Sequence, residues 1–358
     1  MKPLIVPFFI AHQGCPHQCV FCNQVKISGA AEAIPAPAEI ISKIAAYRNS
    51  GRGRALEAAF FGGTFTALPE SVQERLLDPL APLLASGELV SVRVSTRPDA
   101  VDSRTVDFLK KRGVRTVELG IQSMDDAVLE RAGRGHSARD SEKACHLLAA
   151  AGFRVGAQLM PGLPGDTPNT TFATLRRTLL LRPDFLRIYP TLVIAGTELE
   201  RMYRRGDYTP LSLFDAVALC KVLLQEALRA SIPVVRIGLQ ASEEIQEGAA
   251  IVAGPWHSAF RQLVEGDMFY DLMATLTTGL PAGLPVTFYC APARVSEVTG
   301  QRRANLLRLR KERGIEVAAI KIDHCLSWQE LRMETNQIKR SGNMLNLNNA
   351  GEVVNHDC

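Results

Sequence analysis

The sequence predicts an α/β fold: a partial (β/α)6-type, TIM-like barrel followed by a small C-terminal α/β extension. Two observations support this prediction. Strand-like and helix-like segments alternate over the first 240 residues, as they do in βαβ units that share a parallel sheet. There are six or seven such units with short links, and that number suits a full or partial barrel better than a small doubly wound sheet.

Apolar, β-rich runs predict the strands. The first run lies near the N-terminus, the second ends in Gly62-Gly63, and the third alternates between apolar and polar residues. Alternation of this kind indicates a strand. The predicted strands are 4–11, 55–61, 88–96, 115–121, 153–160, 185–190 and 233–237.

Helical patterns fill the intervals between these strands. In 69–85, five leucines recur at helical spacing and form one face, and Gly113 and Gly152 follow the helical patterns that precede them. Glycine is a common residue just after a helix, because it adopts the left-handed conformation easily. The predicted helices are 38–50, 69–85, 103–112, 137–151, 167–181 and 211–230.

The pattern changes after about residue 240. A helix over 257–276, a strand over 286–290, a basic helix over 294–313 and a strand over 315–323 predict the small extension. From about Ser327 the composition turns polar and rich in asparagine, which favours a poorly ordered tail. We therefore expect a core over 1–240, an extension over 241–325 and a tail over 326–358.

The bulk composition is that of an ordinary globular protein. Of the 358 residues 46% are apolar and 22% are charged, and the formal net charge of +4 does not by itself demand a nucleic-acid partner. The N-terminal apolar run is short and interrupted by proline, and no stretch approaches the roughly 18–20 apolar residues of a membrane-spanning helix. We expect a cytoplasmic protein.

Three cysteines in one loop form the most informative motif. Cys15, Cys19 and Cys22 are separated by three and then two residues and directly follow the first predicted strand. Closely spaced thiolates in a protein of a reducing compartment indicate a metal centre. Three thiolates can hold three irons of a [4Fe-4S] cluster and leave the fourth iron open to an exogenous chelate, such as the amino and carboxylate groups of S-adenosylmethionine (SAM). The alternative is a zinc site completed by His12 or His17.

The spacing of these cysteines, with Phe21 just before the third, resembles the signature of the radical SAM superfamily. The resemblance implies that the cysteines bind a [4Fe-4S] cluster, that the backbone at Phe21 lies near the adenine of SAM, and that a flavodoxin-like or ferredoxin-like protein supplies the electron.

The second strand ends in Phe61-Gly62-Gly63-Thr64. Paired glycines let a backbone approach a ligand closely, although a tight turn explains them equally well. In the radical SAM superfamily this segment binds the methionine amino group, which implies that Gly62, Gly63 and Thr64 line the cofactor. The longer string resembles the catalytic subunit of Elongator and its bacterial relatives.

Polar residues at the ends of later strands extend the resemblance. Glu118 and Gln122 fall on one face of their strand and suit ribose hydroxyls, unless they belong to a buried polar network. By resemblance, Arg134 contacts the SAM carboxylate and Gln158 lies near the ribose. Ser95 departs from the glutamate of the relatives.

Further residues await a role. Arg97 suits either an anionic group or an ion pair with Asp99. Arg187, Tyr189 and Arg236 are candidates for the substrate side, or for packing at the barrel rim. The basic residues of the C-terminal helix form either a solvated face or a contact to phosphates; they are Arg302, Arg303, Arg308, Arg310, Lys311 and Arg313.

The sequence thus predicts a radical SAM enzyme that cleaves SAM to a 5′-deoxyadenosyl radical and acts on an unidentified substrate, with RNA or tRNA favoured by the Elongator-like barrel. A tetrapyrrole oxidase resembling coproporphyrinogen oxidases is one alternative, but Gln24 stands where those enzymes carry a further cysteine. A metal-stabilised RNA-binding protein is another. We expect no acetyltransferase domain of the Elongator kind.

Overall fold

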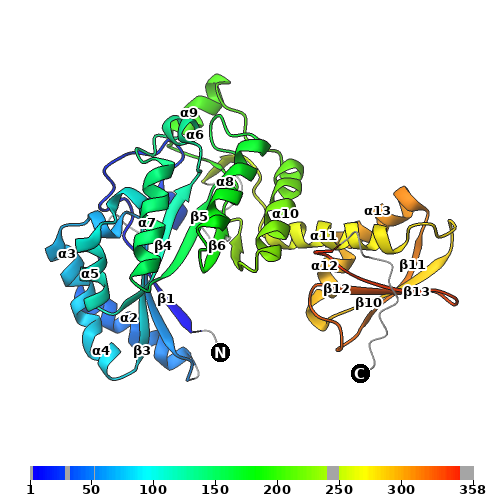
Figure 1. Ribbon diagram of the computed structural model, residues 1–358, viewed down its shortest axis with the longest axis horizontal. Helices are drawn as coiled ribbons and strands as arrows, with labels where there is room; N and C mark the ends of the chain where they lie inside the picture. Colours follow the sequence, from blue (N-terminus) through cyan, green and yellow to red (C-terminus); the bar gives the residue numbers. More distant parts are fainter. Residues whose placement is uncertain (1–2, 29–32, 52, 240–249, 347–358) are drawn as a thin grey trace. The chain divides into compact units, whose positions relative to one another are not determined.

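The computed structural model describes residues 3–28, 33–51, 53–239 and 250–346 (Figure 1). The chain forms two compact units, each of which is considered by itself. The first unit contains residues 1–212 and 232–258, and the second contains residues 213–231 and 259–358. The single boundary that we expected near residue 240 is therefore replaced by three crossings, after residues 212, 231 and 258, because helix α10 (Leu213–Arg229) groups with the second unit.

A seven-stranded parallel sheet forms the core of the first unit. The strand order is β1-β2-β3-β4-β5-β6-β8, and β1 and β8 do not pair with each other, so that the sheet curls into a partial barrel. All seven predicted strands are present, which confirms the fold class. They are β1 (Leu4–Phe9), β2 (Leu56–Phe61), β3 (Leu89–Thr96), β4 (Val114–Gln122), β5 (Arg154–Leu159), β6 (Phe185–Ile188) and β8 (Val234–Ile237).

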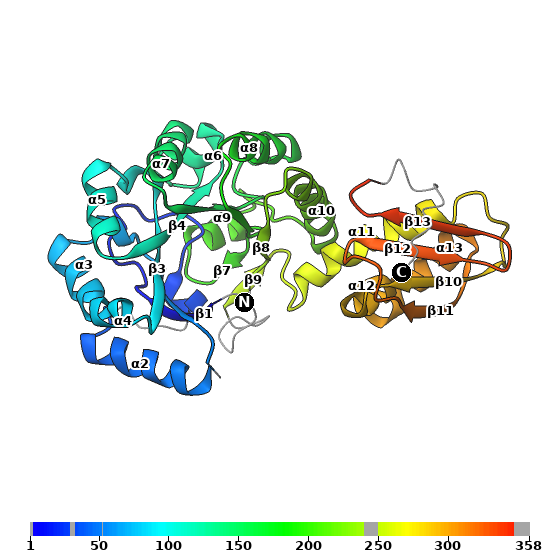
Figure 2. The same cartoon turned by 60° about the horizontal axis from the view of Figure 1, so that its bottom comes forward.

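Helices form an arc outside these strands (Figure 2). The predicted helix over 69–85 is divided by a 3-10 turn at Asp78–Leu80, which contains Pro79. Side chains of Asp102, Ser137 and Thr167 accept hydrogen bonds from the first turns of α5, α7 and α8 and thereby fix where these helices begin. The main helices of the arc are α2 (Pro37–Ser50), α3 (Glu70–Leu77), α4 (Ala81–Ala85), α5 (Ser103–Lys111), α7 (Ala138–Ala150) and α8 (Pro168–Leu180).

Short elements at the mouth of the barrel were not predicted. Each of these elements has between two and eight residues, which is too short for a hydrophobic period to be recognised in the sequence. Strands β7 (Val193–Ile194) and β9 (Ile251–Ala253) pair with each other. The short helices are α1 (Gln24–Ser28), α6 (Asp126–Arg131) and α9 (Glu198–Arg205).

Burial of parallel strands on both faces explains why apolar runs in the sequence predicted these strands. In β2, Ala58, Ala59 and Phe60 are completely buried, and Phe60 packs on Phe8 of β1 with ring centroids 5.3 Å apart. Continuous apolar runs are typical of strands that helices cover on one face and the barrel interior on the other. The carboxyl ends of all seven strands meet at one edge, where the loops that carry the motifs begin.

The second unit combines helices with a mixed sheet of order β11-β10-β12-β13. Its helices are α10, α11 (Phe260–Leu276), α12 (Val295–Thr299) and α13 (Ala304–Arg313), so that the expected basic helix over 294–313 is interrupted at Gly300–Arg303. Its strands are β10 (Pro285–Cys290), β11 (Glu316–Ile322), β12 (Glu330–Glu334) and β13 (Lys339–Asn343).

The last two strands correct one expectation. We expected a poorly ordered tail from residue 326, and this was wrong for residues 330–343, which form a hairpin paired to β10. Leu331 and Met333 are completely buried and alternate with polar residues, but the asparagine-rich surroundings hid this short alternation. Residues 347–358 of the predicted tail lie outside the described residues.

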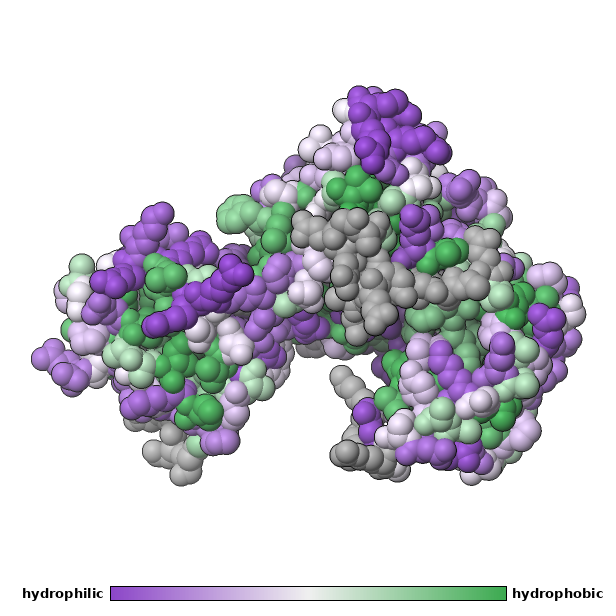
Figure 3. Space-filling view, turned by 180° about the vertical axis from the view of Figure 1, so that it is seen from behind, coloured by the Kyte–Doolittle hydropathy of each residue, from purple (hydrophilic) through white to green (hydrophobic). Residues whose placement is uncertain are grey.

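Figure 3 shows hydrophilic side chains over much of one face, with hydrophobic residues in separate patches between them. In the part of the chain that the structure describes, none of the helices has the length and apolar character needed to span a bilayer.

Candidate functional site

The cysteine loop follows β1, and segments far along the chain hold it in place. The backbone N–H of Thr64 donates to the carbonyl of Gln13 (2.8 Å), that of Val20 donates to Ala132 (3.1 Å), and that of Leu199 donates to Val20 (2.7 Å). The shape of the loop therefore depends on the loops after β2 and β4 and on the start of α9.

The glycine pair after β2 is the closest of these supports. Gly63 has φ +57°, and a Cβ there would lie 2.3 Å from the carbonyl oxygen of Gln13 and 2.6 Å from that of Ile10. No other residue fits such a close approach of two backbones. The Oε1 atom of Gln24 accepts from the N–H groups of both His12 and Gly63, each at 2.6 Å. Gln24 thus connects the cysteine loop to the glycine pair.

The three cysteines have free thiols and influence one another electrostatically. Burial, then repulsion from Cys19 and Cys15, raises the pKa of Cys22 to about 12. Burial also raises the pKa of Cys15, against a hydrogen bond with Thr64 and the charges of Arg97 and Arg134. Within the described ranges no three His, Cys, Asp or Glu side chains converge as a metal-binding group, so the loop presents the thiols without a preformed cage.

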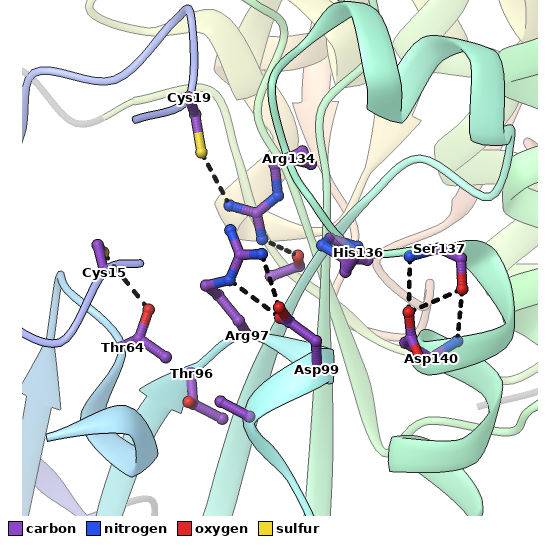
Figure 4. A network of polar contacts seen from close by, with 12 residues as sticks. Cys15, Cys19, Thr64, Thr96, Arg97, Asp99, Arg134, His136, Ser137 and Asp140 are labelled. Atoms are coloured by element: carbon purple, nitrogen blue, oxygen red, sulfur yellow. Dashed lines mark hydrogen bonds and ion pairs between the residues drawn. The ribbon is translucent and has the colours of Figure 1, made fainter. Parts of the chain in front are cut away.

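Arg97 and Arg134 lie on one side of Cys15 and Cys19, and His136 lies beyond them (Figure 4). Arg134 donates from Nη1 to the Sγ atom of Cys19 (3.3 Å) and from Nη2 to the carbonyl of Gly120 (2.6 Å). Arg97, only 3% exposed, makes a bidentate pair with Asp99 through Nε and Nη2, both at 2.9 Å. The ion pair with Asp99 that we considered for Arg97 is therefore present, and because Nη1 has no partner, a contact to an anionic group stays a prediction.

Three buried nitrogen atoms in this group lack a hydrogen-bond partner among the described residues: Nη1 of Arg97, Nε of Arg134 and Nδ1 of His136. Burial, followed by the charges of Arg134 and Arg97, lowers the pKa of His136 to about 4, so that the ring is neutral at physiological pH. Unpartnered buried donors are costly. Two guanidinium groups with a spare donor beside three thiols fit a ligand that carries both a metal-binding group and an anionic group.

Strand β4 ends in a bulge that changes the predicted geometry. Its register with β5 shifts between Leu119 and Gln122, and Gln122 has φ +67°, a left-handed conformation that is uncommon for a residue other than glycine. The Oε1 atom of Gln122 accepts from Nε2 of Gln158 (3.2 Å). The structure therefore brings together the two amides that we expected near the ribose; that role stays a prediction.

Glu118 lies instead in a buried network of charges. Its Oε1 atom accepts from Arg93 (2.5 Å) and Arg187 (3.0 Å), and its Oε2 atom pairs with Arg187 at 2.8 Å. Arg93 also pairs with Glu57 (2.7 Å), and Arg187 donates to the hydroxyl of Tyr189 (3.1 Å). The carboxylate is thus satisfied by arginines, which is the buried-network alternative for this residue.

Phe21 and Cys19 lie in a buried apolar cluster beside the loop, with Leu163, Leu199 and Tyr208 among its members. The Phe21 side chain is part of the core, so any contact to an adenine would come from its backbone. The zinc alternative finds less support at His12, whose Nε2 atom accepts from the backbone N–H of Gln24 (2.9 Å).

Four residues of the site were missed. Gln24 was noted only for the absent cysteine, and His136 was not assigned a role. Glu57 and Arg93 were not singled out, although a charged residue inside an apolar strand is itself a signal, since buried charges are almost always paired. Their pairing depends on strand register, which the sequence alone does not give.

Comparison with known proteins agrees with the arrangement. Residues 9–177 match the model of the radical SAM superfamily, and residues 183–269 match that of the Radical_SAM C-terminal domain. The tRNA uridine(34) acetyltransferase of Methanocaldococcus jannaschii is 34% identical over 182 residues, which cover 45% of this chain and 34% of that protein. Human Elongator complex protein 3 is 30% identical over 189 residues, which cover 47% of this chain and 35% of that protein.

A solved structure of Methanocaldococcus infernus Elp3 with an N-terminal deletion superposes with a TM-score of 0.57 at 25% identity, covering 74% of this chain and 63% of that one. The chain spans about a third of the length of these two curated relatives.

Proposed function

Because this chain belongs to the radical SAM superfamily and is an enzyme of that class, we propose that Cys15, Cys19 and Cys22 hold a [4Fe-4S] cluster whose open iron binds SAM. The observation that carries this is the loop of three free thiols beside two buried arginines with unpartnered donors. When bound, cluster and SAM supply reductive cleavage of a carbon–sulfur bond and a 5′-deoxyadenosyl radical.

The residues around the loop would bind and orient this pair. Arg134, which donates from Nη2 to the carbonyl of Gly120, would hold Cys19 in place through its contact with Sγ. Thr64 supports Cys15 through the contact of Oγ1 with Sγ at 3.4 Å. Gly62 and Gly63 would present backbone groups to the methionine amino group, and the backbone at Phe21 would lie near the adenine.

The remaining groups of SAM would meet polar side chains at the strand ends. Gln122 and Gln158, already joined, would bind the ribose hydroxyls. The free Nη1 of Arg97 is the better donor for the carboxylate, since both Nη atoms of Arg134 are engaged. Glu118 would act indirectly by holding Arg187 at the barrel mouth.

We infer that the substrate is RNA, and more narrowly tRNA. Support comes from the relatives, one of which is named for tRNA uridine(34). Arg187 and Arg236 are register partners on β6 and β8 and are therefore neighbours at the ends of these strands, where they would meet an anionic substrate. We do not extend the acetyl transfer in that relative's name to this chain. The electron would come from an external flavodoxin-like or ferredoxin-like donor.

The test is anaerobic reconstitution with iron, sulfide, SAM and dithionite, followed by measurement of 5′-deoxyadenosine. We expect product from the native protein and none from Cys19→Ala. The matched control is Cys145→Ala, which removes another buried thiol and should leave product formation unchanged.

Two outcomes contradict the proposal. Product from Cys19→Ala would exclude this loop as the cluster site. Zinc in place of iron by elemental analysis, with no product from the native protein, would favour a metal-stabilised RNA-binding protein. The RNA substrate is tested separately, by adding tRNA to the reconstituted enzyme and searching its nucleosides for a new mass.

A further inference from the structure

The net positive charge of the chain is concentrated in one short segment of the second unit. The 14 residues 301–314 contain six basic residues and one acid, a net charge of +5. The whole chain has 41 basic and 37 acidic residues, a net charge of +4. The rest of the chain is therefore net −1, and the segment is exceptional within this protein.

The exposed face of α13 carries only basic and apolar residues. Leu307, Arg310 and Lys311 are spaced i, i+3 and i+4, which places them on one face of the helix, and Arg303 is the N-cap residue directly before it. All four are exposed, whereas Asn305 and Leu309, which lie away from this face, are buried. We call Arg302, Arg303, Arg310 and Lys311 the basic face.

The single acid of the segment is not available to neutralise this face. Glu312 accepts from Nε of Arg308 (3.0 Å) and from the hydroxyl of Tyr270 (2.5 Å). Arg308 is also held by Asp267 (2.8 Å). Both residues are thus tied to α11, and they leave the basic face without an acid of its own.

The basic face differs from ordinary charged helices in its lack of ion pairs. Among the described residues, Arg302, Arg303 and Lys311 have no acidic partner within 4.0 Å, and Arg310 has only the exposed Glu316 at 3.4 Å. On α9, by contrast, each of Arg201, Arg204 and Arg205 is paired with an acid. A merely solvated surface would be expected to resemble α9.

The turn before α13 holds two of these arginines in an unusual backbone conformation. Arg302 and Arg303 have φ +49° and +64°, a region that costs non-glycine residues about 1–3 kcal/mol each. The buried Asn305 keeps this turn in place, because its Nδ2 atom donates to the carbonyls of Gly266 (2.8 Å) and Glu297 (3.0 Å). The arginines are therefore displayed from a fixed backbone.

We propose that the basic face binds the phosphate backbone of RNA. The inference extends the proposed function, since it rests on an RNA substrate. Arginine, which supplies three of the four charges, matches phosphate oxygens with two parallel hydrogen bonds. No aromatic residue lies on the face, so the contact is to phosphates without base stacking, independent of sequence and sensitive to salt.

The test uses the full chain and a fluorescent tRNA transcript, with binding measured by anisotropy between 50 and 200 mM salt. One variant combines Arg302→Gln, Arg303→Gln and Lys311→Gln. A control combines Arg201→Gln, Arg204→Gln and Arg205→Gln on α9, and so removes the same charge. We expect the first variant to bind at least about tenfold more weakly at 50 mM salt, and its slope of log K against log salt to fall by about 2, for three lost contacts at about 0.7 each.

The control should bind like the native protein, and melting temperatures check that both variants fold. Equal losses in the two variants, or none in the first, would overturn the basic face while leaving RNA as a substrate. Loss of reduction by an acidic flavodoxin, with RNA binding intact, would reassign the face to a protein partner. A native chain that fails to bind tRNA at 50 mM salt would overturn both RNA inferences, and the 5′-deoxyadenosine assay would still report the radical chemistry separately.

Discussion

Single residues decide how the site recognises its ligands. By resemblance to relatives we assigned the SAM carboxylate to Arg134, but in the structure this arginine joins Cys19 to Gly120 through both Nη atoms. Arg97 has Nη1 without a partner, and Asp99 holds its guanidinium in place, whereas Arg134 has only Nε without a partner. We therefore expect Arg134 to shape the cysteine loop and Arg97 to be the main donor to the ligand.

Replacing Arg97 with glutamine should weaken SAM binding by about 10- to 100-fold, because hydrogen bonds to a charged group contribute about 1.5–3 kcal/mol. Equilibrium dialysis with the reconstituted protein measures this, and the iron content should not change. Arg104→Gln, which breaks an exposed pair with Glu70, is the control. Unchanged SAM affinity in Arg97→Gln would return the carboxylate to Arg134.

His136 should make stability depend on pH. Its pKa is about 4 in the folded protein and about 6.5 when unfolded. Between these two pH values the imidazole of His136 is protonated in the unfolded chain but neutral in the native protein. The free energy of unfolding therefore falls as the pH drops, by about 3 kcal/mol in total. Denaturant titrations at pH 4.5 and 7 should show a smaller difference in His136→Gln. An identical difference in both proteins would mean that the ring is not held neutral.

Among the secondary-structure elements, those with the most buried apolar residues were the ones that the sequence predicted. The seven strands could be predicted because they are rich in apolar residues, and in β2 nearly every residue is buried, whichever face it lies on. The bulge at Gln122 and the pairing of Glu57 with Arg93 could not be, since both depend on register between distant segments. The glycine pair was predicted to let the backbone approach a ligand. In the structure the group that approaches Gly63 is the backbone of the cysteine loop, and the contact to a ligand stays a prediction.

Gln24 offers a test of that loop as an element. Gln24→Ala removes the acceptor for two N–H groups, and we expect a loss of about 1–3 kcal/mol in stability together with lower retention of iron after reconstitution. Gln24→Glu keeps an acceptor oxygen at the same position and should restore most of both. Denaturant unfolding and iron-to-protein ratios provide the readouts. If Gln24→Ala retained iron as well as the native chain, the connection would not shape the cluster loop.

At the scale of the whole molecule, the chain is organised as two units that exchange segments along the sequence. The alternation of strand-like and helix-like segments predicted a domain boundary near residue 240. In the structure, α10 belongs with the second unit and residues 250–258 belong with the first. Helix α10 resembles the other helices that follow barrel strands, so its pattern could not show which unit it joins. Only its packing does: Lys221 pairs with Asp267 and Asp271 of α11, each at 2.7 Å.

The second unit extends beyond the boundary that composition suggested, and this makes a prediction about its core. Leu331→Ala should destabilise the protein by about 2–5 kcal/mol, as expected for a buried leucine, because Leu331 is fully buried in β12. The comparison is Ile322→Ala in β11, where the side chain is 54% exposed and the cost should be small. Thermal unfolding distinguishes the two; equal effects would mean that β12 is not part of the core.

The supports of the cysteine loop also determine when a nascent chain could first bind the proposed cluster. The thiols emerge at residues 15–22, but the groups that shape their loop follow at Gly63, Ala132 and Leu199. At about 5–20 residues per second, a ribosome needs roughly 10–35 seconds to synthesise the intervening 180 or so residues. During that interval three neighbouring thiols are exposed without their scaffold, open to oxidation and to the wrong metal. We therefore expect the proposed cluster to be loaded only after almost the whole first unit has been made.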